Sequence, residues 1–260
     1  MTDAATAPSR DGPRETSLRG RRLVVTDDKP TFWDKAAAGA WEPELLALLE
    51  AQVSPGTVFL DIGAWVGPTA LFAALLGAEV VAVEADPAAA DRLAGNLDAN
   101  PALAPRVRIL RRAASPRPGH VRLGAARKPG DSMSSVLHAG RQGSWEVETA
   151  TPAALVEAAR EAGCGPLVVK VDIEGGEYAL LPALFAALPA ATRAVIAAFH
   201  PGLLRKAGQD EAEIARATGA CFAGLAGWDA AVLDADGRAG AEKAALSGNC
   251  TIVFTRAGST

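Results

Sequence analysis

The chain has 260 residues, 49% hydrophobic and 22% charged, so it can bury a large core and does not have the composition of a disordered protein. A net charge of −4 argues against a nucleic-acid-binding protein held by phosphate contacts. No apolar run approaches the ~20 residues of a membrane span, and the polar start lacks the apolar stretch of a signal peptide. We therefore expect a cytoplasmic protein that binds neither nucleic acid nor membrane.

Three regions are expected along the chain. Residues 1–17 are polar and should form a disordered tail, and residues 18–56 should form an N-terminal helical lid or brace. Residues 57–260 should then form the main domain. Phe32, Trp33 and Trp41, together with the loop 111–143, could build an apolar pocket for a substrate.

Short apolar segments alternate with helix-like segments through the main domain, which is typical of a mostly parallel sheet covered by helices on both faces. Helices are predicted at 68–76, at 87–100 and from 152 onward, with Asp86 and Thr151 as N-caps. The predicted core strands are 58–62, 79–83, 107–110, 167–173, 194–199, 231–234 and 250–255, and a short strand is expected at 120–123. The sequence thus predicts a seven-stranded α/β fold with one antiparallel strand near its C-terminal end.

A glycine turn follows the first of these strands. Gly63 and Gly67 allow a ligand to approach the backbone closely, and the next helix presents free N–H groups to it. The Gly-x-x-x-Gly spacing differs from that of dinucleotide folds, and a Walker lysine is missing. Asp61 could meet the ammonium group of a cofactor that carries an amino acid, directly or through water.

Glu84 ends the next strand, about 20 residues after the turn. An acid there can accept hydrogen bonds from both hydroxyls of a ribose. The small residue Ala114, which follows the third strand, suits a flat adenine ring. The predicted contacts of an adenosine-type cofactor are Asp61, Gly63, Ala64, Trp65, Gly67, Glu84, Ala85 and Ala114.

Two segments of this region resemble known proteins. Residues 59–67 and 83–87 resemble class I S-adenosylmethionine methyltransferases, and 169–177 (VKVDIEGGE) resembles the Lys-x-Asp-x-Glu-Gly-x-Glu pattern of the FkbM family. Trp41-Glu42-Pro43 is similar to that family's N-terminal helix. The resemblance covers about 32–254. It implies a Rossmann-like class I fold with its methyltransferase domain at 57–260, S-adenosylmethionine as cofactor, and methyl transfer usually to oxygen, often in secondary metabolite or sugar modification.

The chain also departs from that family. It carries Thr151-Pro152-Ala153 where the family often has Thr-Leu-Asp, and its loop 111–143 has a composition of its own. The identity of the acceptor therefore does not follow from the resemblance.

Methyl transfer requires an aligned acceptor and removal of its proton. Asp172 and His200 follow the fourth and fifth core strands, whose carboxyl ends should lie near the cofactor methyl. Because histidine titrates near neutrality, we hypothesise that His200 is the general base, assisted by Asp172. Glu177 is interpreted as a first-turn residue of the next helix. The predicted acceptor contacts are Glu174, Trp41 and Ser134.

Other interpretations stay open. Asp172, Glu174 and His200 could instead offer two oxygens and a nitrogen to a divalent ion, but their spacing in the sequence is not diagnostic and a metal-free site is preferred. The preferred function is O-methylation of a small-molecule hydroxyl. The alternatives are O-methylation of a carboxylate, a nicotinamide-dependent oxidoreductase on a similar sheet, and a non-catalytic binding module. The sequence does not predict the oligomeric state.

Overall fold

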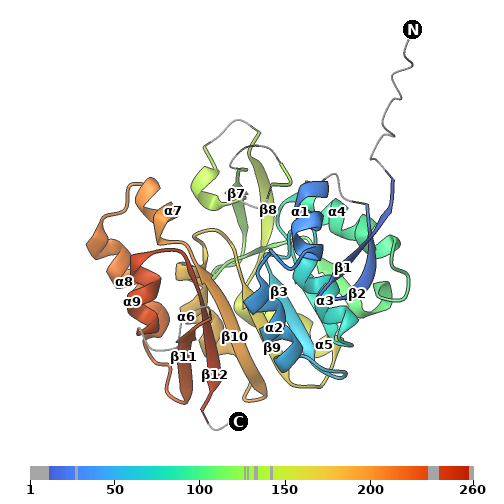
Figure 1. Cartoon of the computed structure of the whole chain (residues 1–260). Helices are drawn as coiled ribbons and strands as arrows, with labels where there is room; N and C mark the ends of the chain where they lie inside the picture. The colour runs from blue at the N-terminus through green and yellow to red at the C-terminus, as the bar shows by residue number, and fades with distance from the viewer. Residues whose placement is uncertain are drawn as a thin grey trace.

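A seven-stranded sheet runs through the centre of the protein (Figure 1). The structure is a computed structural model and describes residues 12–26, 29–125, 127, 129–131, 134–140, 143–233 and 240–257. In spatial order the strands are β11 (Trp228–Val232), β12 (Cys250–Arg256), β10 (Thr192–Phe199), β9 (Leu167–Val171), β3 (Val58–Ile62), β4 (Glu79–Val83) and β5 (Val107–Leu110). Strand β12 is antiparallel to both of its neighbours, and the other pairs are parallel.

The order of the strands reverses between β3 and β9. The chain runs outward from β3 through β4 to β5, and then returns to the other side of β3 with β9 and β10. Ligands of such open α/β sheets bind at the carboxyl ends of the strands, where the order reverses. The topology, including the antiparallel strand, confirms the predicted Rossmann-like fold of class I methyltransferases.

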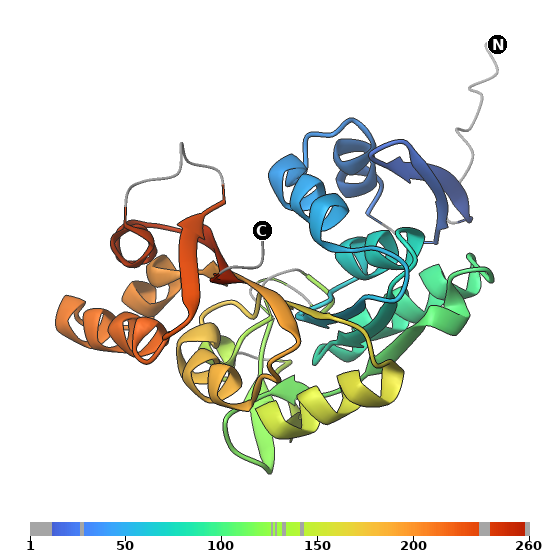
Figure 2. The same ribbon diagram turned by 90° about the horizontal axis from the view of Figure 1, so that it is seen from below.

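Helices cover both faces of the sheet, as Figure 2 shows from below. One hydrophobic core joins the sheet to α1 (Pro30–Ala37), α2 (Pro43–Gln52), α3 (Pro68–Leu75) and α4 (Pro87–Asp98). The second core joins it to α5 (Pro152–Ala162), α6 (Glu177–Ala187), α8 (Glu211–Phe222) and α9 (Ala241–Ser247). None of the helices in the described part of the chain has the length and apolar character that a membrane crossing requires.

The predicted starts of two helices are confirmed. The side chain of Asp86 accepts the N–H groups of Ala88 and Ala89 at the start of α4, and Thr151 accepts the N–H of Ala154 at the start of α5. Both helices place proline at a first-turn position, where no intrahelical hydrogen bond is lost.

The N-terminal region differs from its prediction. Strands β1 (Arg14–Leu18) and β2 (Arg21–Val25) form an antiparallel hairpin, so residues 14–17 belong to a strand and not to the expected tail. The brace at 18–56 is therefore strand and helix, not helix alone. The apolar residues of the hairpin, such as Leu18 and Leu23, are buried in the first core. The hairpin contains few apolar residues and several arginines, so the apolar pattern of its sequence was too weak to predict these strands. Residues 1–11 lie outside the described part of the chain.

A small sheet follows β5 and stands at the carboxyl edge of the main sheet (Figure 1). It consists of β6 (Ala113–Ala114), β8 (Trp145–Ala150) and β7 (His120–Leu123), in that order, and it confirms the strand expected at 120–123. Two 3₁₀ turns, η1 (Ala104–Arg106) and η2 (Val136–His138), lie in the same part of the chain, and α7 (Pro201–Lys206) follows β10.

Two asparagines, one in α4 and one just after it, attach the hairpin to the main domain. Asn100 accepts the N–H of Val24 at 2.9 Å and donates to its carbonyl at 2.6 Å. Asn96, which is fully buried, accepts the N–H of Thr26 at 2.8 Å and donates to the carbonyl of Val66 at 3.0 Å. Asn96 thus links the hairpin to the turn after β3.

We expect Asn96→Ala to lower the free energy of unfolding by about 1–3 kcal/mol, because the substitution leaves the N–H of Thr26 and the carbonyl of Val66 without this partner. Urea denaturation followed by circular dichroism measures the change. The control Asp98→Ala, at an exposed position of the same helix, should stay within about 0.5 kcal/mol of the unmodified protein. Equal effects of the two substitutions would contradict the proposed link.

Candidate active site

Two cavities meet at the carboxyl ends of β3 and β9. The larger has a volume of about 860 Å³ and the smaller about 180 Å³. Five residues line both of them, namely Gly63, Trp65, Asp131, Asp172 and Glu174. A molecule in one cavity can therefore contact a molecule in the other at this junction.

Glu84 is the central acid of the smaller cavity. Its side-chain oxygens accept the N–H groups of Trp65 at 2.6 Å and of Asp86 at 2.7 Å. Burial raises the pKa of Glu84 to about 7, although these hydrogen bonds favour the anion. A carboxylate oxygen can accept more than one hydrogen bond, so Glu84 keeps acceptor capacity toward the cavity that it lines.

The turn after β3 depends on glycine at two positions. Gly63 has φ +85°, and a side chain there would overlap the carbonyl oxygen of Asp172. Only glycine lets this turn pack against the end of β9. Gly67 has φ +92° and precedes α3, where a side chain would overlap Leu93. Gly67 lines neither cavity, so its position indicates a role in packing and not the predicted cofactor contact.

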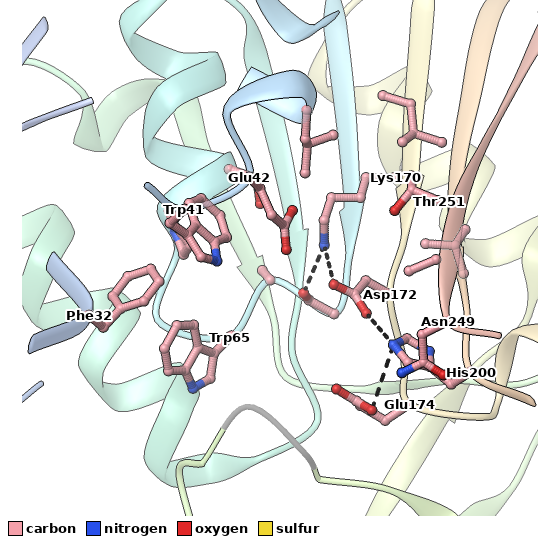
Figure 3. Close-up of a pocket in the computed structure, with 18 of the residues that line it drawn as sticks. Phe32, Trp41, Glu42, Trp65, Lys170, Asp172, Glu174, His200, Asn249 and Thr251 are labelled. Atoms are coloured by element: carbon pink, nitrogen blue, oxygen red, sulfur yellow. Dashed lines mark hydrogen bonds and ion pairs between the residues drawn. The ribbon is translucent and has the colours of Figure 1, made fainter. Parts of the chain in front are cut away.

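A buried ammonium group lies beneath this turn (Figure 3). The Nζ atom of Lys170 is 3.5 Å from Asp61 Oδ1, 3.4 Å from Asp172 Oδ2 and 3.4 Å from the carbonyl oxygen of Gly63. Burial alone would lower the pKa of Lys170, but the surrounding carboxylates outweigh burial and raise it. The group therefore stays charged at neutral pH.

Asp61 has a different place from the predicted one. It is fully buried, lines neither cavity, and accepts the hydroxyl of Thr69 at 2.6 Å while it faces Lys170. Burial raises the pKa of Asp61, and Lys170 opposes that effect. Its position indicates that it supports Lys170 and does not contact a cofactor directly.

His200 lies at the end of β10 among three acids. Its Nε2 atom is 3.8 Å from Asp172 Oδ1 and 3.7 Å from Glu174 Oε2 (Figure 3). Its Nδ1 atom is 3.2 Å from Oε1 of Glu177, which is fully buried. Glu177 begins α6, as interpreted from the sequence, and also accepts the N–H groups of His200 at 2.8 Å and Gly175 at 2.7 Å. Glu177 therefore sets the orientation of the imidazole ring.

Burial and neighbouring charges together control the protonation of this corner. Burial lowers the pKa of His200, but the hydrogen bond with Glu177 and the negative charges of the three acids raise it to about 9. Burial raises the pKa of Glu174 to about 7; His200 opposes this, and Asp172 adds to it. In the protein alone, His200 is thus mostly protonated at neutral pH, and it must lose that proton before it can act as a base.

An aromatic wall faces this corner across the larger cavity (Figure 3). The ring of Phe32 meets Trp41 and Trp65 edge to face, with centroids 5.2 Å and 4.6 Å away. Lys29 lies over the ring of Trp65, at 4.7 Å from its centroid. Trp33 is fully buried and lines neither cavity, so its place in the predicted apolar pocket was wrong. The prediction also missed the charged residues that line the larger cavity.

The other predicted contacts divide between the two cavities. Ala64 and Trp41 line the larger one, whereas Ala85 and Ala114 line the smaller one beside Glu84. Ser134, predicted as an acceptor contact, lines only the smaller cavity, and its hydroxyl donates to Asp86 at 2.7 Å. Its position therefore puts it in the cavity of Glu84 and not in that of Trp41.

Among the residues that line the larger cavity, Lys170 and Glu42 were not predicted as site residues. Lys170 is a charged residue inside a fully buried five-residue strand, a signal that could have marked it. Glu42 projects its carboxylate toward Lys170 from the start of α2 (Figure 3). Burial raises the pKa of Glu42, and Lys170 opposes the rise. No local pattern predicts the direction of its side chain.

Three residues with a strained backbone line the same cavity. Glu42, Trp65 and Glu174 have φ values of 41°, 51° and 51°, and all three line it. Among the described residues, the only other non-glycine residue with positive φ is Arg19, in the hairpin turn. Such conformations cost about 1–3 kcal/mol each and persist where the surroundings impose them. The strain indicates that the cavity geometry is enforced by the fold.

Comparisons with known proteins give similarity of fold only. No family model matches the chain, and no curated protein matches it. The SAM-dependent methyltransferase from Agrobacterium tumefaciens is 12% identical, with a TM-score of 0.46 over 98% of this chain and 72% of its own. The precorrin-6y C5,15-methyltransferase from Geobacter metallireducens is 12% identical, with a TM-score of 0.41 over 83% and 87%. The T. thermophilus 16S rRNA methyltransferase, in complex with AdoMet and guanosine, is 16% identical, with a TM-score of 0.47 over 98% and 53%. At such values the fold assignment rests on the sheet order of this chain itself.

We expect Glu177→Gln to lower the pKa of His200, because the largest of the effects that raise it comes from Glu177. Titration of the imidazole signals by nuclear magnetic resonance, in chelated buffer, measures the shift, and the His200→Gln spectrum assigns the signal. The control Glu157→Gln, at an exposed position of α5, should leave the titration of His200 unchanged. An unchanged pKa in Glu177→Gln would refute the role given to that acid.

Proposed function

We propose that this chain is an S-adenosylmethionine-dependent methyltransferase of the FkbM type that methylates a hydroxyl oxygen of a small molecule. One observation carries the proposal, namely the junction of the two cavities at Asp172 and Glu174. The smaller cavity has an acid suited to a ribose, and the larger has an acid–histidine corner suited to a hydroxyl. The pattern at 169–177 supports the family assignment.

The residues of the smaller cavity fit the adenosyl part of this cofactor. Glu84 would accept the ribose hydroxyls, and the small side chains of Ala85 and Ala114 leave space for a flat ring. The turn 63–65 leads from there into the larger cavity and would hold the methionine end. When bound, the cofactor supplies an electrophilic methyl group on a sulfonium.

The acceptor hydroxyl would lie at the corner formed by Asp172, Glu174 and His200. In the reaction its O–H bond breaks and the proton passes to the corner and then to water. The oxygen would bond to the methyl carbon that the cofactor supplies, and the electron pair of the C–S bond would stay on sulfur. Trp41 and the aromatic wall would hold the body of the acceptor. The volume of about 860 Å³ suits a small molecule.

The site favours a hydroxyl over the two enzymatic alternatives. A hydroxyl must lose its proton when it is methylated, and the corner of Asp172, Glu174 and His200 can take that proton, whereas an acceptor carboxylate needs no base. A nicotinamide dinucleotide needs a pyrophosphate turn, and the Gly-x-Gly-x-x-Gly spacing of such turns does not occur at 63–67. A protein that only binds its ligands would not need the acids and the histidine that converge at the corner.

We expect Glu84→Gln to weaken the binding of S-adenosylhomocysteine by at least about tenfold, because the ribose loses an anionic acceptor. Since ribose hydroxyls donate to the ionised carboxylate, affinity in the unmodified protein should also fall as the pH drops below about 7, the pKa of Glu84. Isothermal titration calorimetry measures both effects.

Glu84→Gln should flatten this pH dependence. The control Glu79→Gln lies at the opposite end of the same strand and should change neither the affinity nor its pH dependence. If no heat of binding appeared with well-folded unmodified protein, the methyltransferase proposal itself would fail.

His200→Ala should lower turnover by at least about a hundredfold, because the corner loses the group that faces both acids. Transfer of tritium from labelled S-adenosylmethionine to a panel of hydroxylated metabolites measures turnover. Affinity for S-adenosylhomocysteine should stay nearly unchanged. His120→Ala, on the exposed strand β7, is the control. Unchanged turnover in His200→Ala would remove His200 from the mechanism.

A further inference from the structure

Three side chains of the corner converge on one point. One carboxylate oxygen each of Asp172 and Glu174 and one ring nitrogen of His200 lie within 4.8 Å of one another. Nε2 of His200 is 3.8 Å and 3.7 Å from the two oxygens, too far for direct hydrogen bonds. Two atoms that bind one divalent cation, each at about 2.0–2.6 Å, lie within about 4–5 Å of each other. The spacing therefore matches a shared cation better than direct pairing.

The orientation of the imidazole ring also favours a bound cation. Nδ1 of His200 faces the buried carboxylate of Glu177 at 3.2 Å, so Nδ1 is the nitrogen that keeps its proton when the ring is neutral. The lone pair of Nε2 then points toward Asp172 and Glu174. Histidines that bind metals characteristically donate their other N–H to a carboxylate or a carbonyl group. Glu177 supplies that partner.

The two carboxylates are also free to act as ligands. Asp172 uses Oδ2 toward Lys170 and directs Oδ1 toward His200. In the part of the chain that the structure describes, no hydrogen bond reaches the side chain of Glu174, although it is only 17% exposed. The backbone of Glu174 is held in the left-handed conformation, with φ 51°, which fixes where its side chain starts.

We propose that Asp172, Glu174 and His200 bind a divalent cation such as Mn²⁺. Two carboxylate oxygens and one imidazole nitrogen form a mixed donor set that suits this class of ion and leaves positions open for a substrate. The sequence analysis preferred a metal-free site, since spacing along the chain is not diagnostic. The folded geometry adds the convergence and the orienting acid.

The position of this ion would allow it to take part in methyl transfer. This part of the inference rests on the proposed function. Asp172 and Glu174 line both cavities, so an acceptor oxygen bound to the ion would face the cofactor side. The cation would orient that oxygen and favour loss of its proton to water. His200 would then act as a ligand and not as the base of the sequence hypothesis.

Binding of Mn²⁺ tests the inference without reference to turnover. Full-length protein is stripped with a chelator and dialysed, and then titrated with MnCl₂ under electron paramagnetic resonance and calorimetry. We expect one ion per chain. Asp172→Asn, Glu174→Gln and His200→Ala should each weaken binding by at least about tenfold, and Glu177→Gln by about 10–100-fold. The control Glu157→Gln removes an acid at an exposed position of α5 and should bind Mn²⁺ as the unmodified protein does.

The outcomes separate this inference from the proposed function. Circular dichroism of each variant shows that it is folded. No Mn²⁺ binding, or equal binding by the ligand variants, would overturn the metal site, and full methyl transfer after exhaustive chelation would overturn its role in the transfer. In each case S-adenosylmethionine-dependent transfer could still stand. Failure to bind S-adenosylhomocysteine would remove the proposed function, while the measurement of Mn²⁺ binding would still decide the metal site.

Discussion

The buried ammonium group of Lys170 is the interaction on which the rest of the site depends. A charge inside a protein is costly unless opposite charges and hydrogen bonds surround it. Asp61 on β3 and Asp172 after β9 supply those charges, and the carbonyl of Gly63 adds a further contact. Lys170 therefore holds together the ends of β3 and β9, where the strand order reverses and both cavities begin. Because the contact with Lys170 holds Oδ2 of Asp172, it also sets the direction of Oδ1.

A second buried charge fixes the other side of the cavity. Glu177 accepts N–H groups from Gly175 and His200, and so connects the loop after β9 to the end of β10. Together the two networks place the carboxylates of Asp172 and Glu174 around Nε2 of His200. Preorganisation of this kind lets an enzyme position reacting atoms before the substrate arrives. The left-handed backbone of Trp65 and Glu174 is a cost that these networks offset.

The N-terminal region closes the cavity from the opposite side. Helix α1 supplies Phe32 and the loop before α2 supplies Trp41 to the aromatic wall, and the hairpin is attached to Asn96 of α4 and to Asn100, just after that helix. Because Asn96 also donates to the carbonyl of Val66, the hairpin is connected to the turn that lines both cavities. The N-terminal region is thus part of the site and not a separate extension of the main domain.

The sequence by itself determined the main sheet and the place of the site. The bounds of β3, β4 and β5 follow from short apolar runs that end at turn residues, and the caps Asp86 and Thr151 act within a few residues of their helices. Glu84 was found because strand ends are local features. These signals depend only on neighbouring residues, so one chain without relatives is sufficient to identify them.

Only the tertiary structure decided which side chains face each other. Asp61 contacts Lys170, which lies 109 positions away along the chain, and the ring of His200 meets Glu177 across 23 positions. The hairpin at 14–25 has few apolar residues, and these are buried only when it packs against α1 and α4. Such pairings depend on strand register, on packing and on the exclusion of water. These properties arise when the whole chain is folded, and no local pattern encodes them.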